Sequence, residues 1–275
     1  MPPKALHFIK LTYAAIQLPL QLLLFMKKHA LLALVLLLSI QEGRAETQTL
    51  FFAKETAKDS TRISLVIEDD QVNGTQEWLP KQPDGHGAHG TISGILSGGG
   101  IMQLLFEYTI EGSEQAEEQV LKLEGDKLFI GEGQLKEDPK NTSRLNLQDP
   151  AKVAFKKVLK KIPVTEPKAG TPVRKAIMDA MRGPVVKEAG SPVLFTGNVR
   201  VSGAWARFSG DVKTADGKKP KNADFSDLMD LDFFSLLKKN DDGAWEVMHQ
   251  GFAGDIGVQE EAHENNPEAP WVLFQ

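Results

Sequence analysis

One glycine-rich stretch of the chain gathers residue types that bind metal ions. Asp84, His86 and His89 place a carboxylate and two imidazoles within one short segment. Zinc sites are built from such ligands, and a structural site needs a fourth. No second histidine pair follows, because His249 and His263 stand singly and far along the chain. The stretch predicts either a metal-binding loop or, as we prefer, a glycine-rich hairpin with two exposed histidines.

A run of acidic residues offers a second kind of chemistry. It contains Glu107, Glu111, Glu114, Glu117 and Glu118. Two close carboxylates can act as acid and base, or as acid and nucleophile, in glycoside hydrolysis. The alternative, which we favour, is a solvated turn around Glu111 between two strands.

Other catalytic classes lack their residues. The chain has no cysteine, which excludes thiol catalysis, cysteine-ligated zinc and disulfides. It has no Gly-x-Ser-x-Gly motif for a serine nucleophile. The glycines around His86 lack the lysine of a phosphate-binding loop. We therefore expect no cofactor and favour a non-enzymatic binding or interaction protein over a metal- or carboxylate-dependent hydrolase of the cell envelope.

The first 45 residues have the anatomy of an export signal. Met26-Lys27-Lys28 precedes an apolar run at 30–40, and Gly43-Arg44-Ala45 ends it with small residues. We expect cleavage after Ala45 and a periplasmic or secreted protein. Residues 1–25 then reflect either a true start at Met26 or a longer leader. A leader that is kept would instead give a membrane-tethered scaffold, the only case in which we expect a membrane partner.

The charge of the chain limits its partners. The formal net charge is −5, and the leader is basic, so residues 46–275 are more acidic still. Nucleic-acid binding selects for basic surfaces, which argues against that class. The one basic cluster is interpreted as a solvated face, and its members are Lys152, Lys156, Lys157, Lys160 and Lys161. The partner is expected to be a small molecule or an envelope protein.

Composition divides the exported part into two domains. Residues 163–172 hold three prolines and a glycine and are typical of a linker. They separate a β-rich domain, 46–162, from a second domain, 173–275. In the first, short apolar runs alternate with turn pairs such as Asn73-Gly74, which predicts a meandering antiparallel sheet, closed or sandwiched. Residues 150–162 fit either a strand or a helical face.

The second domain opens with a predicted helix. Thr171 is suited to the N-cap, Pro172 to the first turn, and Gly183-Pro184 is expected to end the helix. The predicted buried face consists of Val173, Ala176, Ile177, Ala180 and Met181.

Four strands are expected to follow this helix. They are predicted at 193–201, 204–212, 231–237 and 244–252. Trp205 and Trp245 are expected in the core beneath the helix. One helix across an antiparallel sheet is an α+β unit, and its layout is similar to the cystatin or nuclear-transport-factor-2 class of folds.

Two sets of segments carry a resemblance to exported bacterial proteins. The first half resembles a β-rich domain of exported proteins and lipoproteins of unknown function, through 72–94, 107–112 and 123–128. The second half looks like a small exported domain, through 174–182, 201–206 and 242–247. The resemblance implies export and a domain type, and it assigns no activity and no site residue. The chain departs from the lipoproteins because it lacks the lipidated cysteine.

Overall fold

The computed structural model describes residues 47–82, 85–218, 232–252 and 257–275. The predicted signal peptide therefore lies outside the described residues. The chain divides into two compact units, Met1–Thr47 and Gln48–Gln275. The second unit contains two sheets, antiparallel except for one short parallel pairing, and is the one described below. Its α+β class and its mostly antiparallel β content agree with the sequence-based expectation.

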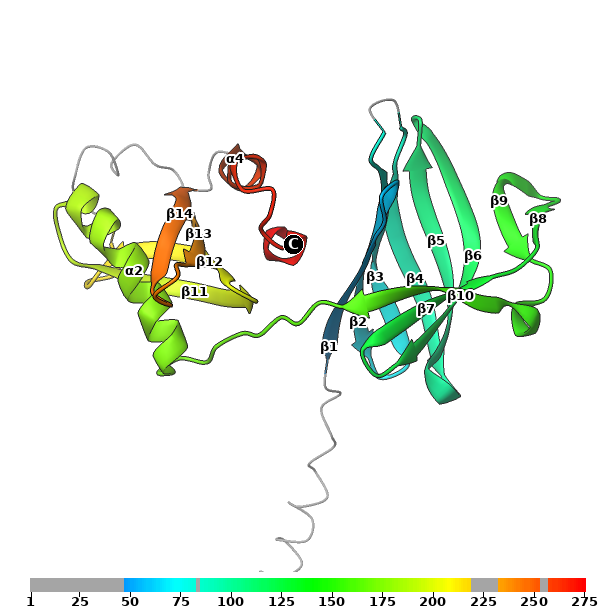
Figure 1. The fold of residues 1–275 in the computed structure, drawn as a ribbon, viewed down its shortest axis with the longest axis horizontal. Helices are drawn as coiled ribbons and strands as arrows, with labels where there is room; N and C mark the ends of the chain where they lie inside the picture. The colour runs from blue at the N-terminus through cyan, green and yellow to red at the C-terminus, as the bar shows by residue number, and fades with distance from the viewer. Residues whose placement is uncertain (1–46, 83–84, 219–231, 253–256) are drawn as a thin grey trace, which may run out of the picture. The chain divides into compact units, whose positions relative to one another are not determined.

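The larger sheet closes into an eight-stranded barrel (Figure 1). Its strands follow the order β5-β4-β3-β2-β1-β10-β7-β6, and β5 pairs with β6 to complete the ring. The strands are β1 (Gln48–Glu55), β2 (Asp59–Glu68), β3 (Gln71–Pro80), β4 (Ala88–Ser97), β5 (Ile101–Ile110), β6 (Ser113–Glu124), β7 (Lys127–Glu132) and β10 (Ala154–Lys161). Of the two forms that the sequence allowed, the closed one is observed, and the ambiguous segment 150–162 contains a strand.

Strand alternation fills the barrel with apolar side chains. Inward positions of neighbouring strands face each other, as Phe52 faces Ile63 and Met102 faces Leu121. These four side chains are fully buried and belong to one core cluster. Burial of such side chains is worth about 1.5–3 kcal/mol each, so the barrel is stabilised by its core without disulfides.

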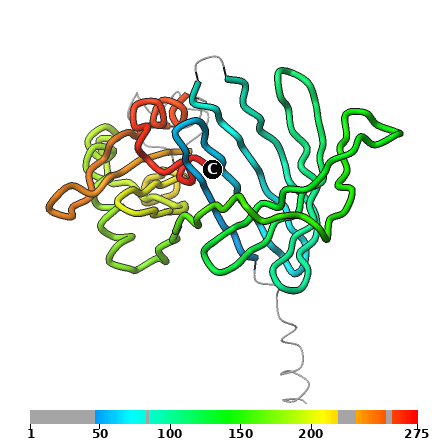
Figure 2. Tube along the Cα trace, turned by 45° about the vertical axis from the view of Figure 1, so that its right-hand side comes forward, coloured from blue at the N-terminus to red at the C-terminus, as the bar shows by residue number. Residues whose placement is uncertain are grey.

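A short hairpin projects from the barrel (Figures 1 and 2). It consists of β8 (Leu135–Asp138) and β9 (Asn141–Leu147), which pair with each other. The hairpin is joined to the barrel by a parallel pairing of β9 with the first half of β6, at Ala116–Arg144 and Glu117–Leu145. The second half of β6 pairs with β7 instead, so β9 replaces β7 as the neighbour of β6 along its length.

The smaller sheet carries the predicted helix on one face. It has the order β11-β12-β13-β14, formed by Val193–Ser202, Trp205–Thr214, Asp232–Lys239 and Trp245–Phe252. Helix α2 (Pro172–Ala189) begins at the predicted N-cap, where the Thr171 hydroxyl accepts a hydrogen bond from the Arg174 backbone N–H. These strands agree with the sequence prediction to within about two residues, the usual uncertainty of element ends.

The expected end of α2 at Gly183-Pro184 is wrong. The helix continues through Pro184 to Ala189, and the left-handed Gly190 (φ 63°) ends it. Proline removes one backbone donor. However, Ile177, Met181, Val185 and Ala189 recur every fourth residue and are all buried. Burial of this longer apolar face stabilises the helix by more than the proline destabilises it. Val173 and Ala176, which were expected on the face, are exposed.

The opposite face of the smaller sheet is covered by C-terminal elements. They are α4 (Gly257–Asn265) and a 3-10 turn at Trp271–Phe274. Here Phe234 and Leu236 pack in a third cluster with Trp205 and Trp271, and Phe51 of β1 meets Trp271 edge-on with ring centroids 5.9 Å apart. Trp245, by contrast, packs beneath α2 as expected. Trp205 is buried, but not under that helix.

The start of the predicted linker and the residue before it pack against other elements. Ile162 and Val164 pack against the third cluster, and Thr165 pairs with Val201 of β11. The placement of the domain boundary at 163–172 stays a prediction. Among the helices that the structure describes, none has the length and apolarity needed to cross a membrane.

Candidate functional site

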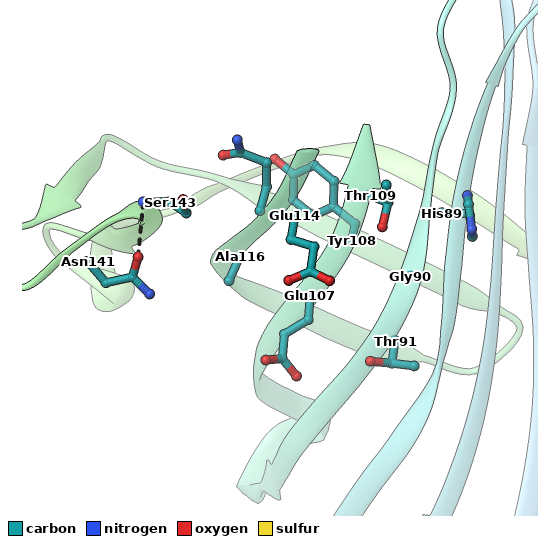
Figure 3. A pocket seen from close by; sticks show the side chains of 11 residues that line it. His89, Gly90, Thr91, Glu107, Tyr108, Thr109, Glu114, Ala116, Asn141 and Ser143 are labelled. Atoms are coloured by element: carbon teal, nitrogen blue, oxygen red, sulfur yellow. Dashed lines mark hydrogen bonds between the residues drawn. The ribbon is translucent and has the colours of Figure 1, made fainter. Parts of the chain in front are cut away.

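A groove lies on the outer face of the barrel beside the projecting hairpin (Figure 3). We call it the outer groove. It has a volume of about 600 Å³ and is bounded by β4, β5 and β6, with Asn141 and Ser143 of β9 forming the far wall. The wall is locally ordered, because the Asn141 side chain accepts a hydrogen bond from the Ser143 backbone N–H at 3.1 Å.

Strand register sets the floor of the outer groove in two rows. One row crosses the three strands as His89, Thr109 and Glu114, and the next as Thr91, Glu107 and Ala116. Residues directly opposite on neighbouring strands have Cβ atoms about 4.5–5.5 Å apart, and diagonal neighbours lie within reach of long side chains. Glu107 and Glu114 are such diagonal neighbours, and Figure 3 shows their carboxylates on the same side of the sheet.

These two carboxylates carry an uncompensated negative charge. Within the described part of the chain, neither Glu107 nor Glu114 forms an ion pair or hydrogen bond, and both side chains are exposed. Hydroxyl groups of Thr91, Thr109 and Ser143 line the same space. The arrangement can bind a cation or accept hydrogen bonds from an amine.

An apolar cavity continues along the same three strands. Its volume is about 350 Å³, and its lining includes Ile95, Leu105, Val120 and Leu147. The two cavities occupy successive stretches of the strands: on the outer face of β5, Leu105 of the apolar cavity lies two residues before Glu107 of the outer groove. Ile95 is 52% exposed and presents an apolar surface to this cavity.

One carboxylate fixes the hairpin over this apolar part. Glu118 accepts a hydrogen bond from the Leu147 backbone N–H at 3.0 Å and pairs with Arg144 at 3.5 Å. Both partners belong to β9, so Glu118 holds that strand beside β6. Its role is structural, and the groove depends on it.

The two predicted metal ligands that the structure describes, His86 and His89, lie in different surroundings. His89 lies on the outer face of β4 and lines the outer groove. His86 precedes the strand, and its Nε2 atom is 3.8 Å from Glu111 Oε1, with both side chains exposed. Asp84 lies outside the described residues. In the ranges that the structure describes, no group of three metal-binding side chains is assembled, so the metal site stays a prediction without a set of ligands.

Strand alternation divides the glutamate run. Glu111 occupies the two-residue turn between β5 and β6 with φ 51°, which agrees with the predicted turn. Glu107, Glu114 and Glu118 face outward, whereas Glu117 faces inward opposite Phe106 of the core. The sequence alone did not single out Glu107 and Glu114 from their neighbours. Period-two alternation on either side of the Glu111-Gly112 turn is the signal that could have done so.

Comparison of the chain with protein-family models, with curated proteins and with solved structures finds no match in any of the three. The class that the fold defines is therefore stated in structural terms alone. It is a closed eight-stranded antiparallel barrel followed by a helix-covered four-stranded sheet.

Proposed function

We propose that the protein is a non-enzymatic binding protein and that its ligand is an amine-bearing small molecule held in the outer groove. The observation that carries this proposal is the pair Glu107 and Glu114, which face one cavity without a cation from the described chain. Concave sites with a few convergent polar groups are the usual places for ligands. The adjoining apolar cavity around Ile95 and Val120 would take a hydrocarbon part of the same ligand.

The location of the protein and its resemblance to other proteins are part of the same proposal. An export signal ending at Ala45 supports a periplasmic or secreted location. The resemblance to exported bacterial proteins of unknown function supports it too. Helix α2 across β11–β14 is compatible with the layout of cystatin or nuclear-transport-factor-2 folds, and that comparison assigns no activity.

Calorimetric titration with two amines tests the proposed function. Spermidine reports on the carboxylates alone, and octylamine reports on the carboxylates and the apolar cavity together. We expect E107Q/E114Q to weaken both ligands roughly tenfold, because two partly exposed charge pairs together contribute about 1–2 kcal/mol. Changing Ile95 to Ser should weaken octylamine and leave spermidine unchanged.

The control removes the same charge elsewhere on the chain. E68Q/E260Q neutralises two exposed carboxylates, one at the end of β2 and one on α4. Its affinities should match those of the unmodified protein. Equal losses in both double variants would reveal a nonspecific effect of net charge, and absence of binding by either amine would contradict the proposal.

A further inference from the structure

The outer face of the barrel changes in polarity along β4, β5 and β6. Strand register arranges the outward side chains of these strands in successive rows of three, with about 6.7 Å between rows. The first two rows carry the acids of the outer groove, Glu114 and Glu107. In the next two rows, Leu105, Ile95 and Val120 provide apolar surface. The fifth row consists of Ser97, Ile101 and Lys122. The face therefore begins with acids, continues with apolar residues and ends at a lysine.

The outer groove and the apolar cavity meet without an intervening row. On each of the three strands, the last residue that lines the outer groove lies two positions from the first residue that lines the apolar cavity. These pairs are Thr91 with Ser93, Glu107 with Leu105, and Ala116 with Glu118. A molecule that is longer than one cavity can therefore lie along the strands and occupy both.

Strand β9 walls one side of both cavities, and the acid at their junction is already paired. Ser143 lines the outer groove, and Leu147 lines the apolar cavity. Glu118 is held by Arg144 and by the Leu147 backbone N–H. Among the acids that line the two cavities in the described part of the chain, only Glu107 and Glu114 lack a cation. The free negative charge is thus confined to one end.

The far end of the apolar cavity offers no free acid to a second ammonium group. Lys122 lies in the row beyond Val120, and its Nζ atom forms an ion pair with Glu124. The same Nζ atom is 5.9 Å from the centroid of the Phe155 ring. An ammonium group that leaves water for apolar surroundings without an acceptor loses much of its hydration energy. The ligand should therefore carry its charge at one end only.

The spacing of the rows sets the length of the ligand. The row of Leu105 lies about 7 Å from that of Glu107, and the row of Ile95 about 13 Å from it. Carbon–carbon bonds near 1.5 Å advance an extended chain by about 1.25 Å per carbon. A chain of about five carbons therefore reaches Leu105, and a chain of about eight to ten reaches Ile95.

We propose that the ligand is an unbranched alkylamine of about eight to ten carbons that lies along the strands. Its ammonium group pairs with Glu107 and Glu114, and its chain covers Leu105 and then Ile95. This inference rests on the proposed function and adds the class, the direction and the length of the ligand.

A series of straight-chain amines from butylamine to dodecylamine tests the length by calorimetric titration, below the concentrations at which they form micelles. A fully buried methylene raises affinity about fourfold, so we expect about twofold for each methylene in a groove that is open on one side. The rise should end near decylamine, and dodecylamine should bind within twofold of it. Octane-1,8-diamine, with an ammonium group at both ends, should bind at least fivefold more weakly than octylamine.

Two variants test the direction of the chain. L105S should weaken binding from hexylamine upward, and I95S only from octylamine upward, because Ile95 lies one row farther from Glu107. Butylamine should bind both variants as it binds the unmodified protein, which also shows that they are folded. The matched control is L194S, since Leu194 on β11 is 51% exposed and Ile95 is 52% exposed. It should leave the whole series unchanged.

The outcomes separate this inference from the proposed function. Absence of binding by every amine would contradict both. Amines that bind without dependence on chain length, or a diamine that binds as tightly as octylamine, would overturn this inference alone. It would also be overturned by a gain that continues through dodecylamine, or by equal losses in L194S and I95S, since either result would reveal nonspecific adsorption of alkyl chains.

Discussion

Gly90 is the residue of β4 that lies between His89 and Thr91 in the lining of the outer groove. A Cβ atom built at this position would stand 1.9 Å from the Glu107 carbonyl oxygen and 2.5 Å from the Tyr108 Cα atom. Both neighbours are backbone atoms, so neither can turn aside. Glycine is required here because β4 and β5 approach too closely for any side chain.

We expect Gly90→Ala to lower the free energy of unfolding by roughly 2–3 kcal/mol, because the strands must separate to admit the methyl group. Urea unfolding followed by tryptophan fluorescence measures the change. Gly98→Ala is the control, since nothing lies within 4 Å of its built Cβ atom. It should change stability by less than about 0.5 kcal/mol. Equal effects of the two substitutions would contradict the close approach.

At the scale of elements, the end of α2 near Pro184 depends on packing and could not be predicted from local sequence rules. The Gly183-Pro184 pair predicts an end of α2 that is too early. Val185 and Ala189, which follow this pair, are buried, and their burial depends on tertiary packing that the local sequence does not show. The four strands of the smaller sheet were predictable, since alternation and turn residues are local signals. Residues 150–162, which contain β10, fitted either a strand or a helical face. The sequence did not decide between a closed barrel and a sandwich. The pairings of β1 with β10 and of β5 with β6 close the barrel.

The same distinction applies to the outer groove. The sequence marked His89 and the glutamates as chemically able residues, and both kinds are found there. It did not indicate Asn141 and Ser143, because β9 reaches the groove only through its parallel pairing with β6. A site whose walls come from distant segments cannot be assembled from local patterns.

Pro184→Ala should stabilise the protein by roughly 2 kcal/mol, because alanine restores an N–H donor to the Ala180 carbonyl in the middle of α2. Pro184 is exposed, so no packing is lost. Pro172→Ala serves as the control. Pro172 occupies the first turn, where the N–H has no helical partner, and its replacement should leave stability nearly unchanged. Thermal unfolding of both variants measures the difference, and a destabilised P184A would show that the helix needs its proline.

At the scale of the whole molecule, the first strand begins immediately after the predicted cleavage site. β1 starts at Gln48, and the predicted cut follows Ala45. Removal of residues 1–45 would leave every described element intact, and the apolar cores of both sheets would be unchanged. A chain without cysteine can therefore be stabilised by its apolar cores without disulfides.

We predict that the exported protein begins at Glu46, because the small-residue end of the signal at Ala45 matches the preference of signal cleavage. The intact mass of the protein recovered from the exported fraction, without denaturation, measures this. The same spectrum shows any ligand that is retained. An uncut chain in the membrane fraction would contradict the prediction and would favour the tethered scaffold.

The thin attachment of the β8–β9 hairpin has a kinetic consequence. Two residue pairs and the Glu118 contacts join it to the barrel, whereas β5 pairs with β4 and β6 over nearly its whole length. The hairpin can therefore open while the barrel stays folded, and its amide protons should exchange with deuterium much faster than those of β5. A molecule bound in the outer groove contacts both β9 and β6 and would slow that exchange. Protection at Ser143 would thus identify ligands from a mixture before any of them has been named.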